Sequence, residues 1–381
     1  MTGLAREDHA RAGGSFGQVR GVEVARHYGD PAAEYVSATI AAAVRDRGHR
    51  ALLLVTGRAP VDTLNGVLAG RMPRPPASPA EGVVRGRAEY SAVLSAKGRV
   101  VADARVMWGP VPHEESLWLD VPRPAFEPLL AHLRRYVPPR LAAVEDVSEE
   151  AGLLTVMGPG APALLGELVD SGEGLDVFKG LKEGDYLTSG DGRERVLRTS
   201  DVDTPAWDVF TSKGRSRELW RQFLDQGVAP VGAGVWDTLR VEAGRPAFGQ
   251  DMDESCILSE VGIVDRAVDH AKGCYTGQEV IVRIRDRGHV NRSLRGLHLG
   301  ECPAPGSDAE IFHEGAVVGR VTSAVNSPRC GGAIALAYVR REVPPGGAVA
   351  AGSEDGPSAT VRELAPGWAA PPAPSASVGS R

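Results

Sequence analysis

Residues 272–279 read Lys-Gly-Cys-Tyr-Thr-Gly-Gln-Glu, and this short stretch predicts the start of a helix. Thr276 and Glu279 have the Thr-x-x-Glu spacing of a capping box, in which each side chain bonds a free backbone N–H at the helix start. An apolar stripe with helical spacing follows, and Gly288 is a typical C-terminal stop. Cys274 is therefore expected about two residues before the helix N-cap.

Two roles are open to Cys274. The helix start carries a partial positive charge, and in an extended segment the side chain of Lys272 points to the same side as that of Cys274. Both features stabilise a thiolate, so the pattern is consistent with a reactive thiol whose electrostatic partner is Lys272. The alternative is a buried cysteine that packs as a small hydrophobic residue. The residues alone leave both interpretations open.

The octapeptide resembles the signature of the YgfZ family, folate-binding proteins of iron–sulfur cluster assembly and repair. That family is similar to the T-protein (aminomethyltransferase) of the glycine cleavage system. Further blocks resemble the superfamily without separating its branches: Lys97–Asp103, Thr238–Gly244 and Gly315–Ser323. The resemblance covers roughly residues 20–360. It implies an α+β fold in a cloverleaf arrangement, with a folate-binding, aminomethyltransferase-like body of two subdomains over 20–290 and a C-terminal β-barrel over 291–362.

The residue pattern outside the motif predicts regular elements of both kinds. Strands are expected at 52–55, 89–94, 100–106, 117–121 and 153–157, and helices at 126–136, 216–226 and 235–243. The strands at 52–55 and 153–157 each precede a glycine and a helical pattern, which is consistent either with two related halves or with chance similarity between ordinary βα units.

The residue pattern changes in the C-terminal part of the chain. Short β segments at 294–299, 316–323 and 333–338 are typical of a small barrel. The tail at 363–381 is rich in Pro, Ala and Ser and is expected to be disordered, with Trp368 as a residue that can still dock on the body. The segment Pro73–Pro79 is expected to be a proline-rich surface loop.

Composition limits the class of protein. The chain has 381 residues, 42% of them hydrophobic, which suits two or three globular domains. A net charge of −6 without a dense basic block argues against nucleic-acid binding. No apolar run is long enough to span a membrane, and the N-terminal residues lack a signal-peptide pattern, so a cytoplasmic protein is expected. The 4 cysteines show neither disulfide-framework nor metal-site spacing, so no bound metal is predicted.

The resemblance assigns the remaining site residues to tetrahydrofolate. Glu242 matches the glutamate of pterin recognition, with Arg240 beside it. The alternative is an exposed helix carboxylate that pairs with Arg240, Arg245 or solvent. Asp103 is expected near the folate N10 position, although T-proteins usually have two consecutive aspartates here and this chain has Ala102. The alternative is that Asp103 only pairs with Arg99 or Arg105. Tyr275 is expected to wall the folate channel or to staple the helix, and Gln278 to donate to the ligand or face solvent.

Three functions follow as hypotheses. The leading one is a tetrahydrofolate-binding factor that assembles or repairs iron–sulfur proteins through Cys274, with client enzymes or assembly proteins as partners. The alternative is a folate-dependent aminomethyltransferase or demethylase of the T-protein type, against which Ala102 and Cys274 both count. A non-catalytic folate sensor or scaffold is the third.

Overall fold

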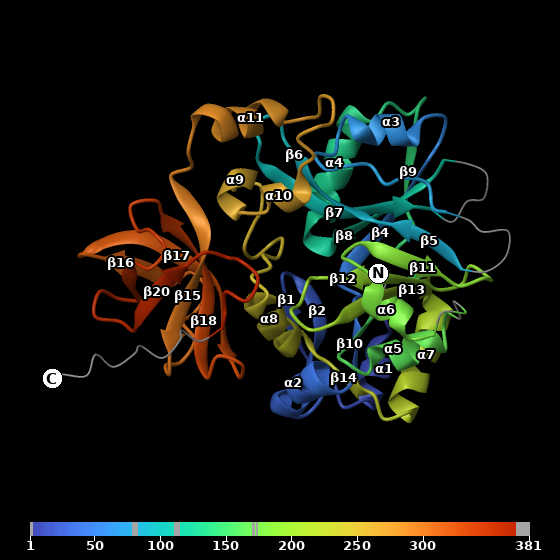
Figure 1. Cartoon of the computed structure of the whole chain (residues 1–381), viewed down its shortest axis with the longest axis horizontal. Helices are drawn as coiled ribbons and strands as arrows, with labels where there is room; N and C mark the ends of the chain where they lie inside the picture. Colours follow the sequence, from blue (N-terminus) through green and yellow to red (C-terminus); the bar gives the residue numbers. More distant parts are fainter. Residues whose placement is uncertain (1–2, 78–82, 110–114, 170–171, 173, 371–381) are drawn as a thin grey trace. The chain divides into compact units, whose positions relative to one another are not determined.

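The computed structural model describes residues 3–77, 83–109, 115–169, 172 and 174–370. The chain divides into two compact units (Figure 1). The first unit comprises Met1–Trp236 and Ala247–His289, and the second comprises Asp237–Pro246 and Val290–Arg381.

One sheet of the first unit has the strand order β14-β3-β10-β13-β12-β11-β5. Neighbouring strands are antiparallel except β14 and β3, which are parallel. The bounds are β3 (Ala43–Asp46), β5 (Val84–Arg87), β10 (Ala151–Met157), β11 (Asp185–Thr188), β12 (Arg195–Thr199), β13 (Ala206–Ser212) and β14 (Ala229–Pro230). Helices α5 (Ala161–Gly166), α6 (Asp176–Gly180) and α7 (Lys213–Asp225) pack on this sheet through a shared apolar core.

Helix α7 shows why these residues form an element of this kind. The Ser212 side chain caps its start by accepting from the Arg215 N–H. Leu219, Trp220 and Phe223 recur at helical spacing and are buried, so one stripe of the helix faces the core. The predicted helix at 216–226 is confirmed, but it begins at Lys213, three residues before the predicted start at Ser216.

The other sheet of the first unit has the strand order β6-β7-β8-β4-β9, all antiparallel. Its bounds are β4 (Arg50–Thr56), β6 (Glu89–Leu94), β7 (Val100–Trp108), β8 (Leu117–Pro122) and β9 (Ala143–Asp146). It is accompanied by α3 (Pro60–Asn65), the 3-10 turn η1 (Arg123–Ala125) and α4 (Phe126–Tyr136). Leu52 and Met107 of this sheet share a buried cluster with Leu153 and Phe210 of the first, so the two sheets face each other there.

The two predicted βα units recur, one in each sheet. Strand β4 leads through Gly57 to α3, and β10 leads through Gly158 to α5. Both glycines have positive φ, 129° and 97°, and a Cβ would lie 2.7 Å from the Leu141 oxygen at Gly57 and 2.5 Å from the Ala41 oxygen at Gly158. The same turn chemistry at equivalent places is consistent with two related halves.

Smaller elements complete the first unit. They are α1 (Arg6–Arg11), β1 (Ser15–Val19), β2 (Val22–His27), α2 (Pro31–Ile40), α9 (Leu258–Val261), α10 (Val264–Ala267) and α11 (Gln278–Arg287). Helix α8 (Ala233–Glu242) begins in the first unit and continues into the second. No helix in the described ranges is long and apolar enough to cross a membrane.

The second unit contains a closed barrel with the strand order β15-β18-β17-β16-β19-β20. The bounds are β15 (Arg292–Gly300), β16 (Glu310–His313), β17 (Ala316–Ser327), β18 (Gly332–Arg340), β19 (Ala348–Ala351) and β20 (Ser358–Arg362). Trp368 is buried here, and its Nε1 donates to the Val241 oxygen at 3.1 Å. The docking foreseen for Trp368 is therefore confirmed. The last stretch of the predicted tail, 371–381, lies outside the described residues, as does Pro79 of the predicted loop.

The α+β fold class with a C-terminal β-barrel is confirmed, but the predicted capping box is wrong. The N-cap of α11 is Gly277, with φ 84°, and no side chain caps the helix. A Cβ at Gly277 would lie 2.5 Å from the Ser95 oxygen and 2.9 Å from the Leu94 Cβ. Only glycine fits this close contact, so the helix starts at Gly277. The side-chain cap expected from Thr276 and Glu279 is not formed. Gly288 ends the helix as predicted.

Candidate functional site

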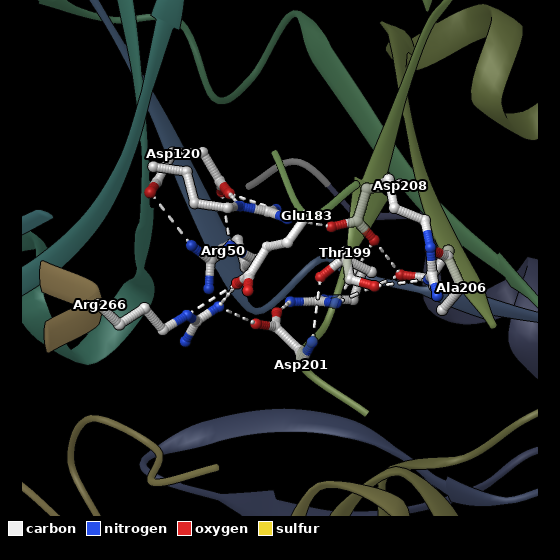
Figure 2. Close-up of polar contacts among 12 residues, drawn as sticks. Arg50, Asp120, Glu183, Thr199, Asp201, Ala206, Asp208 and Arg266 are labelled. Atoms are coloured by element: carbon white, nitrogen blue, oxygen red, sulfur yellow. Dashed lines mark hydrogen bonds and ion pairs between the residues drawn. The ribbon is translucent and has the colours of Figure 1, made fainter. Parts of the chain in front are cut away.

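Charged side chains are buried between the two sheets of the first unit (Figure 2). Arg50 on β4 donates through Nε to Asp120 on β8 at 2.6 Å. Arg105 on β7 donates through Nε to the other Asp120 oxygen, also at 2.6 Å, and binds Asp208 on β13 through Nη1. The ion pairs therefore connect strands that belong to different sheets.

A second group of ion pairs continues the network. Arg47, just after β3, binds Asp208 at 3.4 Å and Asp201 at 3.1 Å. Arg266, at α10, donates through Nε to Glu183 at 2.7 Å and approaches Asp201 at 3.5 Å. Figure 2 shows the Arg266 guanidinium pointing toward both carboxylates.

The arginines lower the pKa of two carboxyl groups of the network, those of Asp120 and Asp201. Burial opposes ionisation of Asp120, but Arg105 and Arg50 outweigh it and lower the pKa of that carboxyl. At Asp201 burial is likewise outweighed, chiefly by Arg47 and Arg105, and the pKa falls well below its ordinary value. These groups are paired with one another, so opposite charges neutralise each other in the layer between the sheets.

Asp103 differs from the network carboxylates. It lies on β7 and is 8% exposed, and its Oδ2 accepts the Tyr90 hydroxyl at 3.0 Å. Its Oδ1 is buried and has no hydrogen-bond partner among the described residues. Burial raises the pKa of Asp103, and Arg50 and the Tyr90 hydrogen bond oppose the shift only in part. A buried acceptor that lacks a donor is the feature expected where a ligand N–H binds.

Tyr90 holds Asp103 from the neighbouring strand. In the β6–β7 pairing Asp103 lies opposite Ala92, so Tyr90 is its diagonal neighbour on the same face. The Arg266 guanidinium lies over the Tyr90 ring, 3.9 Å from the ring centre, and links this pair to the charged network. Sequence analysis did not single out Tyr90. The strands predicted at 89–94 and 100–106 are joined by a short segment, and pairing them as a hairpin would have brought Tyr90 near Asp103.

Ala102 is fully buried on the opposite face of β7 from Asp103. An aspartate at 102 would therefore point into the core behind the strand rather than toward the face that holds Tyr90 and Asp103.

Lys272 is committed to backbone groups. Its Nζ donates to the oxygens of Leu68 at 2.7 Å and Gly70 at 2.8 Å. Burial lowers the pKa of Lys272 to about 8, and Asp269 opposes the shift. Cys274 is exposed, so its alternative role as a buried packing residue is wrong. Within the described part of the chain, no hydrogen bond joins Lys272 to Cys274.

The motif packs on the turn of the β6–β7 hairpin. Gly277 lies against Ser95 and Leu94, and a Cβ at Gly98 would lie 2.8 Å from the Val280 side chain. Tyr275 is buried, and the Lys272 ammonium lies 5.7 Å from its ring centre. Gln278 is the first residue of α11 and is half-buried. The structure thus brings together the octapeptide and the hairpin block, which sequence analysis had treated separately.

Arg240 and Glu242 lie in the second unit, on the last turn of α8. Glu242 is 1% exposed, and its Oε1 accepts the Ser327 hydroxyl of β17 at 2.5 Å, so the alternative of an exposed helix carboxylate is wrong. Arg240 binds Asp237 at 2.8 Å and the Ser323 hydroxyl at 2.8 Å. Both side chains fix the helix end to the barrel strand.

Comparison with known proteins places these features in a family. The model of the GCVT N-terminal domain matches residues 5–272, and that of the glycine cleavage T-protein C-terminal barrel domain matches residues 292–362. An aminomethyltransferase of Synechocystis sp. PCC 6803 is 30% identical, covering 78% of this chain and 77% of the relative. One of Rubrobacter xylanophilus is 29% identical, covering 88% and 86%.

A solved structure agrees in fold. The aminomethyltransferase T of the glycine cleavage system from Bartonella henselae superposes with a TM-score of 0.80 at 20% identity, covering 94% of this chain and 95% of that one.

These matches correct the leading functional hypothesis. An iron–sulfur assembly or repair factor is contradicted, because the curated relatives that span most of the chain are aminomethyltransferases. The matches support the T-protein superfamily and do not single out the YgfZ branch. The chain belongs to the glycine cleavage T-protein (aminomethyltransferase) family.

Proposed function

We propose that this protein is a tetrahydrofolate-dependent aminomethyltransferase. It transfers the carbon of an aminomethyl group from the lipoyl sulfur of a carrier protein to tetrahydrofolate, which leaves a thiol on the carrier and releases the nitrogen as ammonia. Its relatives of that name and the likeness of its fold support the proposal. The observation that carries it is the buried Asp103 oxygen that lacks a hydrogen-bond donor among the described residues.

The donors of reduced folate fit this acceptor. N5 and N10 of tetrahydrofolate both carry an N–H group, and these two nitrogens accept the one-carbon unit during transfer. A carboxylate that receives such an N–H forms a charge-assisted hydrogen bond, which is stronger in a water-poor site. Asp103 would hold the N–H, and Tyr90 would keep the carboxylate in its orientation through the hydrogen bond to Oδ2.

The surrounding charges suit Asp103 to handle a proton. Burial raises its pKa, so the carboxyl can take up a proton released at a ligand nitrogen and return it. The Arg266 guanidinium lies over the Tyr90 ring and fixes its position. Arg50 opposes the rise that burial causes in the pKa of Asp103. Arg266 and Arg50 are thus positioning residues, and Asp103 is the residue in contact with substrate.

The other site assignments stay predictions. Glu242 remains the candidate for the pterin edge, with Arg240 as the residue that anchors its helix to the barrel. Roles of Tyr275 and Gln278 in the folate channel, and of Cys274 and Lys272 in chemistry, rest on the sequence motif alone.

Titration of tetrahydrofolate into the purified protein by calorimetry tests the proposal. Asp103→Asn keeps the shape of the side chain but removes its charge, and a hydrogen bond to a charged group contributes about 1.5–3 kcal/mol. We therefore expect Kd to rise about 10- to 150-fold. The control is Asp225→Asn, which changes an exposed carboxylate at the end of α7 and should leave Kd unaltered. Equal affinity of Asp103→Asn and wild type would contradict the assignment.

A further inference from the structure

A large cavity lies within the first unit, separate from Asp103 and Tyr90. Its volume is about 1160 Å³, and residues of both sheets and of the α7 N-terminal turn line it. The lining residues used below are Trp118 of β8, Phe210 and Thr211 of β13, Arg195 of β12, and Trp108 of β7. Its volume is somewhat above the roughly 300–1,000 Å³ that is usual for small-molecule sites.

Aromatic rings form one wall of the cavity. Trp118 and Phe210 come from different sheets and stack with ring centres 6.3 Å apart and an interplanar angle of 28°. Both residues line the cavity, so they offer aromatic contacts to the ring of a ligand.

Arg195 supplies a buried positive charge at this wall. It is 8% exposed, and its guanidinium lies 4.8 Å from the Trp118 ring centre and 4.5 Å from that of Tyr186. Its hydrogen bonds go to neutral groups, from Nε to the Thr188 hydroxyl at 3.2 Å and from Nη1 to the Trp108 oxygen at 2.5 Å. No carboxylate pairs with Arg195 in the described part of the chain.

This absence sets Arg195 apart from Arg50 and Arg105, which are also buried. Arg50 and Arg105 each bind at least one buried aspartate, whereas Arg195 keeps its charge without a counter-ion among the described residues. An unpaired buried charge is unfavourable by several kcal/mol, so a site of this kind favours an anionic ligand.

A second polar group of the same cavity also lacks a partner. The Thr211 hydroxyl is buried and makes no hydrogen bond among the described residues. The remaining charged groups of the lining lie at more exposed positions. Arg215 is paired with Glu194 at 2.8 Å and with Glu218 at 3.2 Å, and Arg193, Glu115 and Glu150 are exposed. The buried charge of the cavity is therefore the positive charge of Arg195.

We propose that this cavity is a binding site for an aromatic carboxylate. The ring of the ligand lies on Trp118 and Phe210, its carboxylate pairs with the Arg195 guanidinium, and the Thr211 hydroxyl donates to it. A planar guanidinium can bind the two oxygens of a carboxylate, which suits Arg195 better than a compact ammonium would. This site is independent of the proposed aminomethyl transfer.

The test uses naphthalene-2-carboxylate and its uncharged analogue naphthalene-2-carboxamide as probes. Binding to the full-length protein is measured by calorimetry and by tryptophan fluorescence, to which Trp108 and Trp118 contribute. We expect the acid to bind at least tenfold tighter than the amide. Arg195→Met should remove this preference, whereas Arg193→Met, which changes an exposed cation of the same lining, should keep it.

Several results would overturn the proposal. They are no saturable binding of the acid to wild type, equal binding of acid and amide, and an unchanged preference in Arg195→Met. Competition between the acid and tetrahydrofolate would also overturn it, because the acid would then occupy the folate site. The acid–amide comparison needs only wild-type protein, so the proposal stays testable if Arg195→Met does not fold. Thr211→Val provides a second variant, for which weaker binding of the acid is expected.

Discussion

Replacing Asp120 by asparagine removes one charge from the buried network and preserves the shape of the side chain. Asp120 is 1% exposed and accepts from both Arg50 and Arg105. In the variant these two arginines stay buried between the sheets, and the amide that replaces the carboxylate can neutralise neither. The network would therefore contain one uncompensated positive charge.

The magnitude follows from this loss of pairing. Removing one partner of a buried ion pair lowers the free energy of unfolding by about 3–5 kcal/mol. A change of 1 kcal/mol moves the melting temperature by about 2–4 °C in proteins of 150–250 residues, so we expect Tm to fall by about 6–20 °C. Asp176→Asn is the control, since the exposed pair of Asp176 with Lys179 is screened by solvent and should leave Tm unaltered.

The difference in unfolding free energy between wild type and Asp120→Asn should depend on pH. The folded-state pKa of Asp120 is lowered from its ordinary value of 3.8, so its stabilising contribution is complete above that pH and is lost as pH falls toward the folded-state value. Calorimetric melting at pH 7 and at pH values below 3.8 should show wild type and Asp120→Asn converging in acid. A loss of less than 1 kcal/mol at pH 7, or a gap that widens in acid, would refute the reasoning.

Further outcomes concern the barrel and the motif. Ser327→Ala removes the hydroxyl that donates to buried Glu242 and should lower the unfolding free energy of the second unit by about 1.5–3 kcal/mol in urea denaturation; an unchanged midpoint would contradict this. Lys272, with its pKa lowered to about 8, should reach half its maximal rate of acetylation near that pH, as followed by peptide mass spectrometry. A half-maximal pH above 10 would mean that its ammonium is not held in the buried position described.

The sequence predicted elements well where one local signal determined them. The Lys97-Gly98 turn between two strand-like segments predicted the bounds of β6, and the residue pattern of 126–136 predicted those of α4. The start of α11 was predicted wrongly, because contact with Ser95 and Leu94 determines the conformation of Gly277. Local propensity could not contain that tertiary constraint.

The buried charge layer was not predictable in the same way. Its members come from separate strands and loops, and arginine and aspartate are usually exposed, so each looked like a surface residue. Asp103 was found through its family block, but its unpaired oxygen depends on burial that only the packed sheets reveal.

The functional error has a physical cause as well. The octapeptide was interpreted through Cys274, yet three of its other residues have structural roles. Lys272 holds the Leu68–Gly70 segment, the Thr276 N–H donates to the Gly66 oxygen at 3.1 Å, and Gly277 permits contact with the hairpin. A motif that fixes local packing identifies a fold more securely than a reaction.

The most direct test of the central claim is an aminomethyl-transfer assay. Aminomethylated lipoyl carrier protein and tetrahydrofolate are incubated with wild type, Asp103→Asn or Asp225→Asn, and ammonia and methylenetetrahydrofolate are quantified. The aminomethyltransferase of Bacillus subtilis, a relative 29% identical to this chain, serves as the positive control. We predict turnover by wild type and by Asp225→Asn. For Asp103→Asn we predict a rate that is reduced by about 100-fold or more. No ammonia release by wild type while the positive control turns over would contradict the account.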